Sequence, residues 1–327
     1  MANATRSLTA RPGKQVRREA RRFKFQKTMR DMKANYQLYL IIAIPLIWLI
    51  IFKYVPMVGA QIAFKDYRAV DGIFGSKWVG LKNFKRFFSN YQFWQVLKNT
   101  VTISLYQLIA GFPFPIILAL AMNATLRTKF KKTVQMVTYM PHFISVVVLV
   151  GMVLQFTNPR VGIINTVIKA FGGTPIDFMS KSSLFSSIYV WSGVWQSCGW
   201  GTIIYLAALA GVDTELHEAA MLDGASRFKR MIHIELPLIV PTMVTMLILQ
   251  FGRIMDLGFE KIYLMQNSLN RDASEVISTL VYKVGLAANV PDFAYATAIG
   301  LFNSVINLAL VLIVNKVCKK ISGTGLW

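Results

Sequence analysis

The distribution of hydrophobic residues divides the chain into long apolar segments separated by shorter polar ones. A helix that crosses a bilayer needs about 20 mostly apolar residues, because the hydrocarbon core is about 30 Å thick and each residue rises about 1.5 Å. Six segments reach that length, at residues 37–58, 99–122, 134–156, 184–211, 236–257 and 293–315. The pattern therefore predicts an all-α integral membrane protein with six transmembrane helices.

Two of these segments carry residues that disturb a regular helix. The second contains Gly111, Pro113 and Pro115, and proline removes a backbone hydrogen bond, so a kink is expected there. The fourth contains three glycines, which allow close approach of a neighbouring helix: Gly193, Gly199 and Gly201.

The composition supports a membrane protein and argues against a nucleic-acid partner. Of 327 residues, 54% are hydrophobic and 16% charged, with a mean hydropathy of +0.47. The net charge of +21 would suggest nucleic-acid binding in a soluble protein. In a chain this apolar, attraction to an anionic membrane leaflet is the simpler explanation, and we predict no nucleic-acid partner. The two cysteines, Cys198 and Cys318, indicate neither a disulfide framework nor a metal pair.

The distribution of basic residues predicts the orientation. The first 35 residues contain 11 Lys or Arg, which indicates a basic cytoplasmic tail over residues 1–35 that precedes a transmembrane domain over residues 36–327. Six crossings return the C-terminus to the same side. The polar loop between the fourth and fifth spans, residues 213–237, is then also cytoplasmic.

This loop has the features of a short docking helix. Asp213 can cap its start, and Ala219 and Ala220 are small enough for a partner surface to approach. Gly224 permits a bend before the next span. Apolar residues recur at helical spacing and predict one face: Met221, Ala225, Phe228 and Ile232. The residues alone leave open a surface helix that packs only against its own spans.

A second amphipathic stretch lies between the first two spans. Aromatic and apolar residues recur there at near-helical spacing: Trp78, Leu81, Phe84, Phe87 and Phe88. They predict either a helix on the outer membrane surface or a contact for an external partner.

The chain lacks the common signatures of catalysis. It has no GxxxxGK[ST] phosphate loop, no GxSxG elbow and no HExxH motif, and its three histidines are scattered. We therefore predict that it is not an enzyme and holds no metal or cofactor. Any energy for its work comes from another protein.

Several motifs resemble those of a known family. The run Glu218–Ala220, Gly224 after three residues and Ile234–Pro237 after nine more resembles the EAA loop of ABC importer permease subunits, in the maltose-type carbohydrate branch. Residues 54–57, 62–67 and 258–264 resemble the polysaccharide- and oligosaccharide-uptake permeases of the alginate and lipoprotein-linked sugar systems. The resemblance covers nearly all of residues 36–318.

The resemblance implies a role for the loop. In the family this helix is the coupling helix, which sits in a cleft of an ATPase subunit. Glu218 would then be the acidic contact, Ala219 and Ala220 would allow the close approach, and Gly224 would form the turn. Asp223 is also counted among the coupling residues.

The resemblance also implies an assembly and a location. A second homologous permease, two ATPase subunits that bind ATP and Mg²⁺, and an extracellular substrate-binding lipoprotein would complete a transporter in the bacterial cell membrane. The complex would import oligosaccharide or polysaccharide by alternating access.

Polar and aromatic residues inside the spans predict the substrate path, because such side chains are costly in lipid. The candidates are Trp195, Gln196, Trp200, Gln250, Arg253, Asn303 and Asn307. The tryptophans also suit helix packing, and Arg253 also suits an ion pair with Asp256 or with the partner permease. An Arg253 that faces the path would favour an acidic sugar.

The sequence leaves the sugar and its chain length open. Two alternative functions also remain: an ABC importer permease for a non-sugar solute, and a membrane scaffold without a transport path.

Overall fold

The computed structural model describes residues 29–125, 127–323 and 325–326. Most of the predicted basic tail therefore lies outside the described residues. The chain divides into two compact units, Met1–Ala60 and Gln61–Trp327. In the first, α2 (Tyr36–Leu49) continues through a π-helical turn, η1 (Ile50–Tyr54), into α3 (Val55–Met57). A 3₁₀ segment, η2 (Val58–Phe64), completes one helical run from Tyr36 to Phe64.

The second unit begins with small elements and continues as a helical bundle. A two-residue antiparallel hairpin, β1 (Lys65–Asp66) with β2 (Lys77–Trp78), encloses α4 (Gly72–Gly75). The short helix α5 (Lys82–Phe88) follows. The bundle then contains α6 (Phe93–Gly111), α7 (Pro113–Asn123), α8 (Thr128–Tyr139), η3 (Met140–Phe143), α9 (Val146–Phe156), α10 (Ile163–Ala170) and α11 (Ser182–Ala210).

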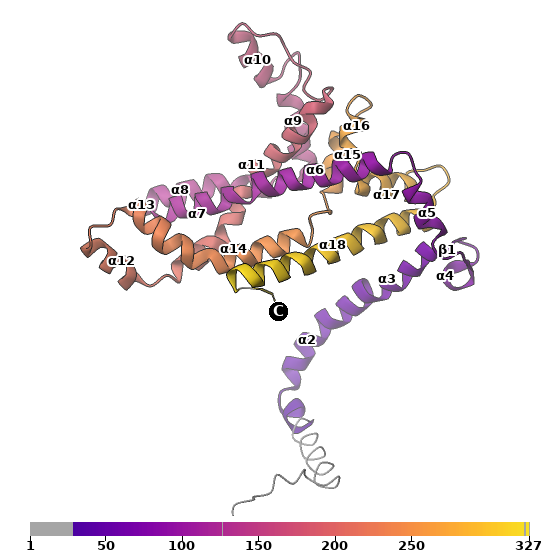
Figure 1. Cartoon of the computed structure of the whole chain (residues 1–327), viewed down its shortest axis with the longest axis horizontal. Helices are drawn as coiled ribbons and strands as arrows, with labels where there is room; N and C mark the ends of the chain where they lie inside the picture. The colour runs from indigo at the N-terminus through magenta and orange to yellow at the C-terminus, as the bar shows by residue number, and fades with distance from the viewer. Residues whose placement is uncertain (1–28, 126, 324, 327) are drawn as a thin grey trace, which may run out of the picture. The chain divides into compact units, whose positions relative to one another are not determined.

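The remaining elements complete the bundle and its two ends. They are α12 (Thr214–Leu222), α13 (Arg227–Arg230), η4 (Met231–Glu235), α14 (Leu236–Phe251), α15 (Phe259–Met265), α16 (Arg271–Ser274), α17 (Ile277–Gly285) and α18 (Phe293–Ser322). In this unit α12 and α13 lie at one end, and α5 and α17 lie at the other (Figure 1).

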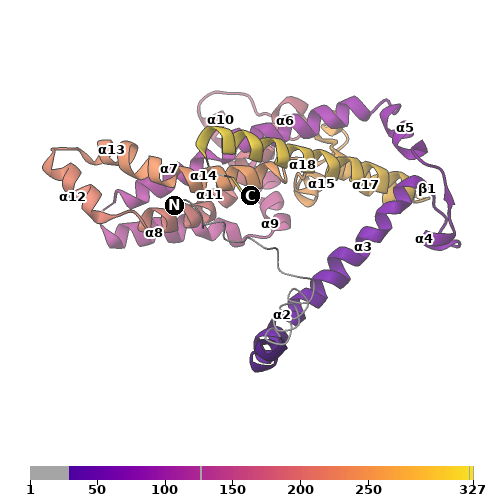
Figure 2. The same cartoon turned by 60° about the horizontal axis from the view of Figure 1, so that its bottom comes forward.

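The long helix α11 lies at the centre of this bundle. It packs against α6, α7, α8 and α14, and α14 packs in turn against α18. These helices run side by side in both views (Figures 1 and 2). One apolar cluster joins α11 to α7 and α14 around Leu209 and Ile239, and another joins it to α15 around Val190 and Ile262.

Four described helices are long and apolar enough to cross a membrane: Tyr36–Phe64, Phe93–Asn123, Arg227–Phe251 and Phe293–Ser322. The predicted third span is not straight, because Thr128–Phe143 and Val146–Phe156 are bent by 100°. Counted as one span, this pair makes a fifth. The predicted fourth span, α11, is 29 residues long but is not among these candidates. The second span changes from α6 to α7 at Phe112, where the kink was predicted.

The amphipathic stretch between the first two spans forms two elements and not one helical face. Trp78 belongs to strand β2, and only the later residues lie in α5. Phe87 is fully buried in a cluster with Phe93 and Tyr295. The neighbouring Phe88 is 49% exposed, so part of the predicted apolar face remains on the surface.

The predicted close approach at the α11 glycines is confirmed at two of them. A Cβ atom on Gly199 would lie 2.0 Å from the backbone oxygen of Thr138 on α8, and one on Gly201 would lie 3.0 Å from Pro115 on α7. These distances are shorter than van der Waals contact. The helix α11 can therefore lie this close to α8 and α7 only because glycine has no side chain at these two positions.

Gly199→Ala is therefore expected to lower the thermal unfolding temperature of the detergent-solubilised protein, with a cost of about 1–3 kcal/mol for overpacking. Gly300→Ala is the matched control, because Gly300 lies within α18 and no neighbouring atom lies within 4 Å of the place where its added methyl group would sit. Equal unfolding temperatures for Gly199→Ala and the unchanged protein would contradict the close approach.

Candidate functional site

The helix start of α12 is fixed by a side-chain cap. Asp213 accepts a hydrogen bond from the backbone N–H of Glu215 at 3.0 Å. This bond satisfies one of the donors that the first turn of a helix leaves free. The cap predicted at Asp213 is confirmed.

The end of α12 is closed by a tight turn at Gly224. Its φ of 75° lies in the left-handed region, which glycine adopts at little cost. The N–H of Ala225 donates to the carbonyl of Ala220 at 2.8 Å, and the N–H of Gly224 donates to that of Met221 at 3.1 Å. This pair of bonds is the Schellman arrangement that ends many helices.

This turn corrects one expectation. The sequence spacing predicted a single apolar face running from Met221 to Ile232. The chain instead reverses at Gly224, so Met221 lies on α12 and Phe228 on α13. The glycine turn ends the helix, although the spacing of the apolar residues would fit one continuous helix.

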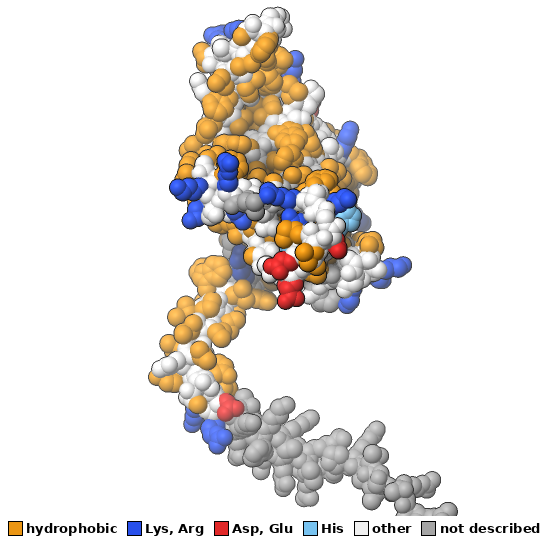
Figure 3. Space-filling view, turned by 90° about the vertical axis from the view of Figure 1, so that its left-hand side faces the viewer, with side chains coloured by type: hydrophobic (Ala, Val, Ile, Leu, Met, Phe, Trp, Pro, Cys, Tyr) orange, Lys and Arg blue, Asp and Glu red, His pale blue; other side chains and the backbone are white. Residues whose placement is uncertain are grey.

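The surface of α12 is open. Glu218, Ala219 and Asp223 are exposed and Ala220 is half-buried, and the helix contains no buried residue. Figure 3 looks onto the end of the bundle that carries α12 and α13, where acidic side chains lie beside Lys and Arg side chains. The predicted docking residues thus lie on a helix with an accessible, mixed-charge surface.

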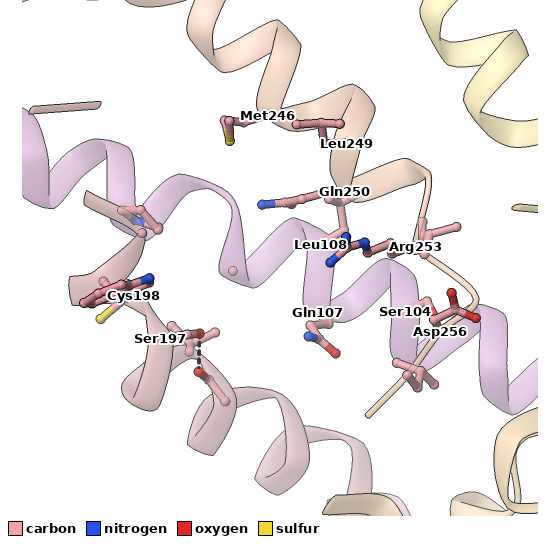
Figure 4. Close-up of a pocket in the computed structure, with 18 residues that line it drawn as sticks. Ser104, Gln107, Leu108, Ser197, Cys198, Met246, Leu249, Gln250, Arg253 and Asp256 are labelled. Carbon is pink, nitrogen blue, oxygen red and sulfur yellow. Dashed lines mark hydrogen bonds between the residues drawn. The ribbon is translucent and has the colours of Figure 1, made fainter. Parts of the chain in front are cut away.

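A cavity of about 580 Å³ lies between α6, α7, α11, α14 and the segment after α14. Its lining combines apolar residues with a small set of polar ones: Ser104, Gln107, Ser197, Gln250, Arg253 and Asp256. In Figure 4, Gln250 and Arg253 extend from the α14 side of this space, and Gln107 extends from α6. Polar groups that converge in a cavity of this size are typical of a small-molecule site.

Three predicted path residues line the cavity: Trp200, Gln250 and Arg253. The Trp200 ring stacks on His142, with centroids 4.5 Å apart and planes 4° apart. This stack holds one aromatic side chain of the wall in place.

The other four predicted path residues are not in this lining. Gln196 donates to the backbone oxygen of Ile144 at 2.8 Å. Asn307 is buried and accepts from the N–H of Met255 at 3.0 Å. Trp195 is 48% exposed. Asn303 donates to the carboxylate of Asp256 at 2.8 Å, so it contacts a lining residue and holds it in position.

Sequence reasoning missed the α6 wall of the cavity. Ser104 and Gln107 lie three residues apart on α6, which puts them on one helix face. Polar residues at that spacing were the available signal. The Ser104 hydroxyl is buried and has no hydrogen-bond partner among the described residues.

Arg253 is the cation of this cavity. The predicted alternative was an ion pair with Asp256, but among the described residues no ion pair or hydrogen bond engages the Arg253 guanidinium. Asp256 is bonded to Asn303 instead. An unpaired guanidinium beside amides and a hydroxyl favours a ligand that carries a carboxylate or another anionic group.

A second basic group lies behind the cavity wall. Lys261 on α15 is 8% exposed, and its Nζ donates to the backbone oxygen of Tyr189 at 2.8 Å. The same Nζ lies 3.1 Å from the place where a Cβ on the lining residue Gly193 would sit. Burial lowers the pKa of Lys261 to about 8, so the amine is still mostly protonated at pH 7. Its charge adds to the positive character of this wall.

Known proteins resemble this chain over most of its length. The model of the family described as "Binding-protein-dependent transport system inner membrane component" matches residues 111–322. This range includes α12 and the cavity walls from α7, α11 and α14, but not Ser104, Gln107 and Leu108 on α6. The polygalacturonan/rhamnogalacturonan transport system permease protein YteP of Bacillus subtilis (strain 168) is 43% identical over 290 residues, 89% of this chain and 90% of that protein.

Solved structures show the same fold. The crystal structure of a bacterial ABC transporter involved in the import of the acidic polysaccharide alginate has a chain with a TM-score of 0.82 and 36% identity, covering 90% of this chain and 99% of that one. A chain of the bacterial alginate ABC transporter in complex with an alginate pentasaccharide-bound periplasmic protein has a TM-score of 0.83 and 37% identity, covering 91% and 99%. The chain therefore belongs to the family of binding-protein-dependent transport system inner membrane components, as a sugar permease subunit of an ABC transporter.

Proposed function

We propose that this permease carries an acidic oligosaccharide or polysaccharide through the cavity between α6, α11 and α14. Transport proceeds by alternating access, and it is coupled to separate ATPase subunits through α12. ATP and Mg²⁺ bind in those subunits. A second permease completes the membrane part, and an extracellular binding protein delivers the saccharide.

The observation that carries this proposal is the unpaired Arg253 guanidinium in the cavity lining. Guanidinium groups bind carboxylates in a bidentate manner, and uronic acid sugars carry one carboxylate per residue. Gln107 and Gln250 can hydrogen-bond sugar hydroxyls, and Trp200 offers an aromatic surface. The names of the relatives, which refer to polygalacturonan and to alginate, point to the same substrate class.

The proposal includes six crossings, with both termini and α12 in the cytoplasm. The helix α11 has 29 residues, which span about 44 Å and so exceed the hydrocarbon core. Its polarity fits a span whose Ser197 and Trp200 line an aqueous cavity rather than face lipid. The bent pair of α8 with η3 and α9 supplies the third crossing.

Substrate-stimulated ATP hydrolysis tests the proposed substrate class. The permease is reconstituted with its partner permease, the ATPases and the binding protein, and galacturonate oligosaccharides are compared with carboxyl-reduced oligosaccharides of equal length. We expect stimulation and uptake with the acidic saccharides and at least about tenfold less with the neutral ones, because one charged hydrogen bond contributes about 1.5–3 kcal/mol. Equal transport of both would contradict the proposal.

A further inference from the structure

The helix α12 has few ties to the rest of the bundle. It contains no buried residue, and the turn that joins it to α13 is open, with nothing within 4 Å of a methyl group placed on Gly224. A helix held this loosely needs a specific contact if its movement is to reach a membrane span. Without such a contact, the backbone turn at Gly224 would bend when α12 moves and would not pass the movement on.

One polar side-chain contact joins α12 to the span that follows. Nε2 of His217 on α12 lies 3.8 Å from Oε1 of Glu235, the last residue of η4, immediately before α14. Among the described residues, this is the one polar side-chain contact between α12 and another helix of the bundle. This contact joins α12 directly to η4, without passing through the backbone turn at Gly224.

The Glu235 carboxylate is under-satisfied. The residue is 7% exposed, and its Oε2 is buried without a hydrogen-bond partner among the described residues. A buried acceptor without a donor costs about 1–3 kcal/mol, and more when it is charged. At 3.8 Å the contact with the His217 imidazole is longer than a hydrogen bond. A small displacement of α12 therefore changes how well this carboxylate is paired.

We propose that His217 and Glu235 form the side-chain link through which movement of α12 reaches α14. The proposal rests on the role of α12 as the contact to the ATPase subunits. When the ATPases move α12 inward, the imidazole approaches the carboxylate and draws the base of α14 with it. Because α14 carries Gln250 and leads into Arg253, its displacement reaches the substrate cavity.

The test uses the complete transporter in proteoliposomes and measures saccharide molecules taken up per ATP hydrolysed. His217→Gln and Glu235→Gln keep similar side-chain volumes, and they remove the imidazole and the carboxylate of this contact. Each is expected to lower this ratio about fivefold or more, within the usual range of coupling energies between sites. The double variant is expected to match the single variants, because all three remove the same contact.

His233→Gln is the matched control. This histidine is two residues from Glu235, is exposed, and its Nδ1 contacts the backbone oxygen of Lys229 at 2.9 Å rather than an acidic group. Its uptake per ATP should stay unchanged. If Glu235→Gln does not assemble, His217→Gln decides alone, because that side chain is 21% exposed and tolerates replacement.

The outcomes separate this link from the function on which it rests. Normal uptake by Glu218→Lys would contradict the docking of α12 itself. Loss of uptake in Glu218→Lys, together with an unchanged ratio in His217→Gln, would leave the docking intact and overturn the link. A double variant whose loss equals the product of the two single losses would also overturn it.

Discussion

Glu218→Lys is expected to abolish ATP-driven uptake while the permease still inserts and pairs with its partner permease. Glu218 is exposed on a helix without buried residues, so its replacement costs little folding energy. At a docking surface, however, reversing one charge places like charges together, which costs several kcal/mol. We expect uptake below about one tenth of the original rate, with reduced co-purification of the ATPase subunits.

Asp31→Lys is the control for this variant. Asp31 is exposed and precedes α2, so the substitution makes the same change in charge on the side expected to be cytoplasmic, at a distance in sequence from α12. It should leave uptake and assembly unchanged. Normal uptake and normal ATPase co-purification by Glu218→Lys would contradict the role of α12.

Arg253→Gln is expected to weaken transport of acidic saccharides selectively. The substitution removes the cation of the cavity lining but keeps a polar side chain. The loss of a charged hydrogen bond of about 1.5–3 kcal/mol raises the KM for a uronate oligosaccharide about tenfold or more. Uptake of a carboxyl-reduced oligosaccharide, already low, should not fall further.

Arg253→Lys separates charge from geometry. A lysine keeps the positive charge but not the bidentate fork, so its KM should lie between those of the original protein and Arg253→Gln. An unchanged KM for the acidic saccharide in Arg253→Gln would contradict the proposed substrate site.

The sequence predicted well those features that depend on local chemistry. The cap at Asp213 and the close packing at Gly199 follow from what each residue type does to its own backbone or immediate neighbour. Such signals need no knowledge of the tertiary arrangement.

Features that depend on helix orientation were harder to predict. The 100° bend before α9 separates residues that the hydropathy pattern joined into one span. The reversal at Gly224 likewise separated Met221 from Phe228, although their spacing fits one helix. Hydropathy records how apolar a segment is and not the direction in which it runs.

For the cavity, too, the sequence indicated polar residues within single helices but not which helices come together. Polarity within a span marked Gln250 and Arg253, which line the cavity, but it marked Gln196 and Asn307 equally, and the structure bonds those two to backbone groups. The spacing of Ser104 and Gln107 on α6 was a signal of the same kind, but polarity alone does not show that they face Gln250 and Arg253. Only the packing of α6 against α11 and α14 brings these walls together.

A structure of the assembled transporter with a bound galacturonate oligosaccharide would show whether this cavity is the saccharide site. We expect a saccharide in the cavity between α6, α11 and α14, with one sugar carboxylate within about 4 Å of the Arg253 guanidinium, the usual limit of an ion pair. An Arg253 paired instead with an acidic residue of the partner permease, with the saccharide bound elsewhere, would contradict it.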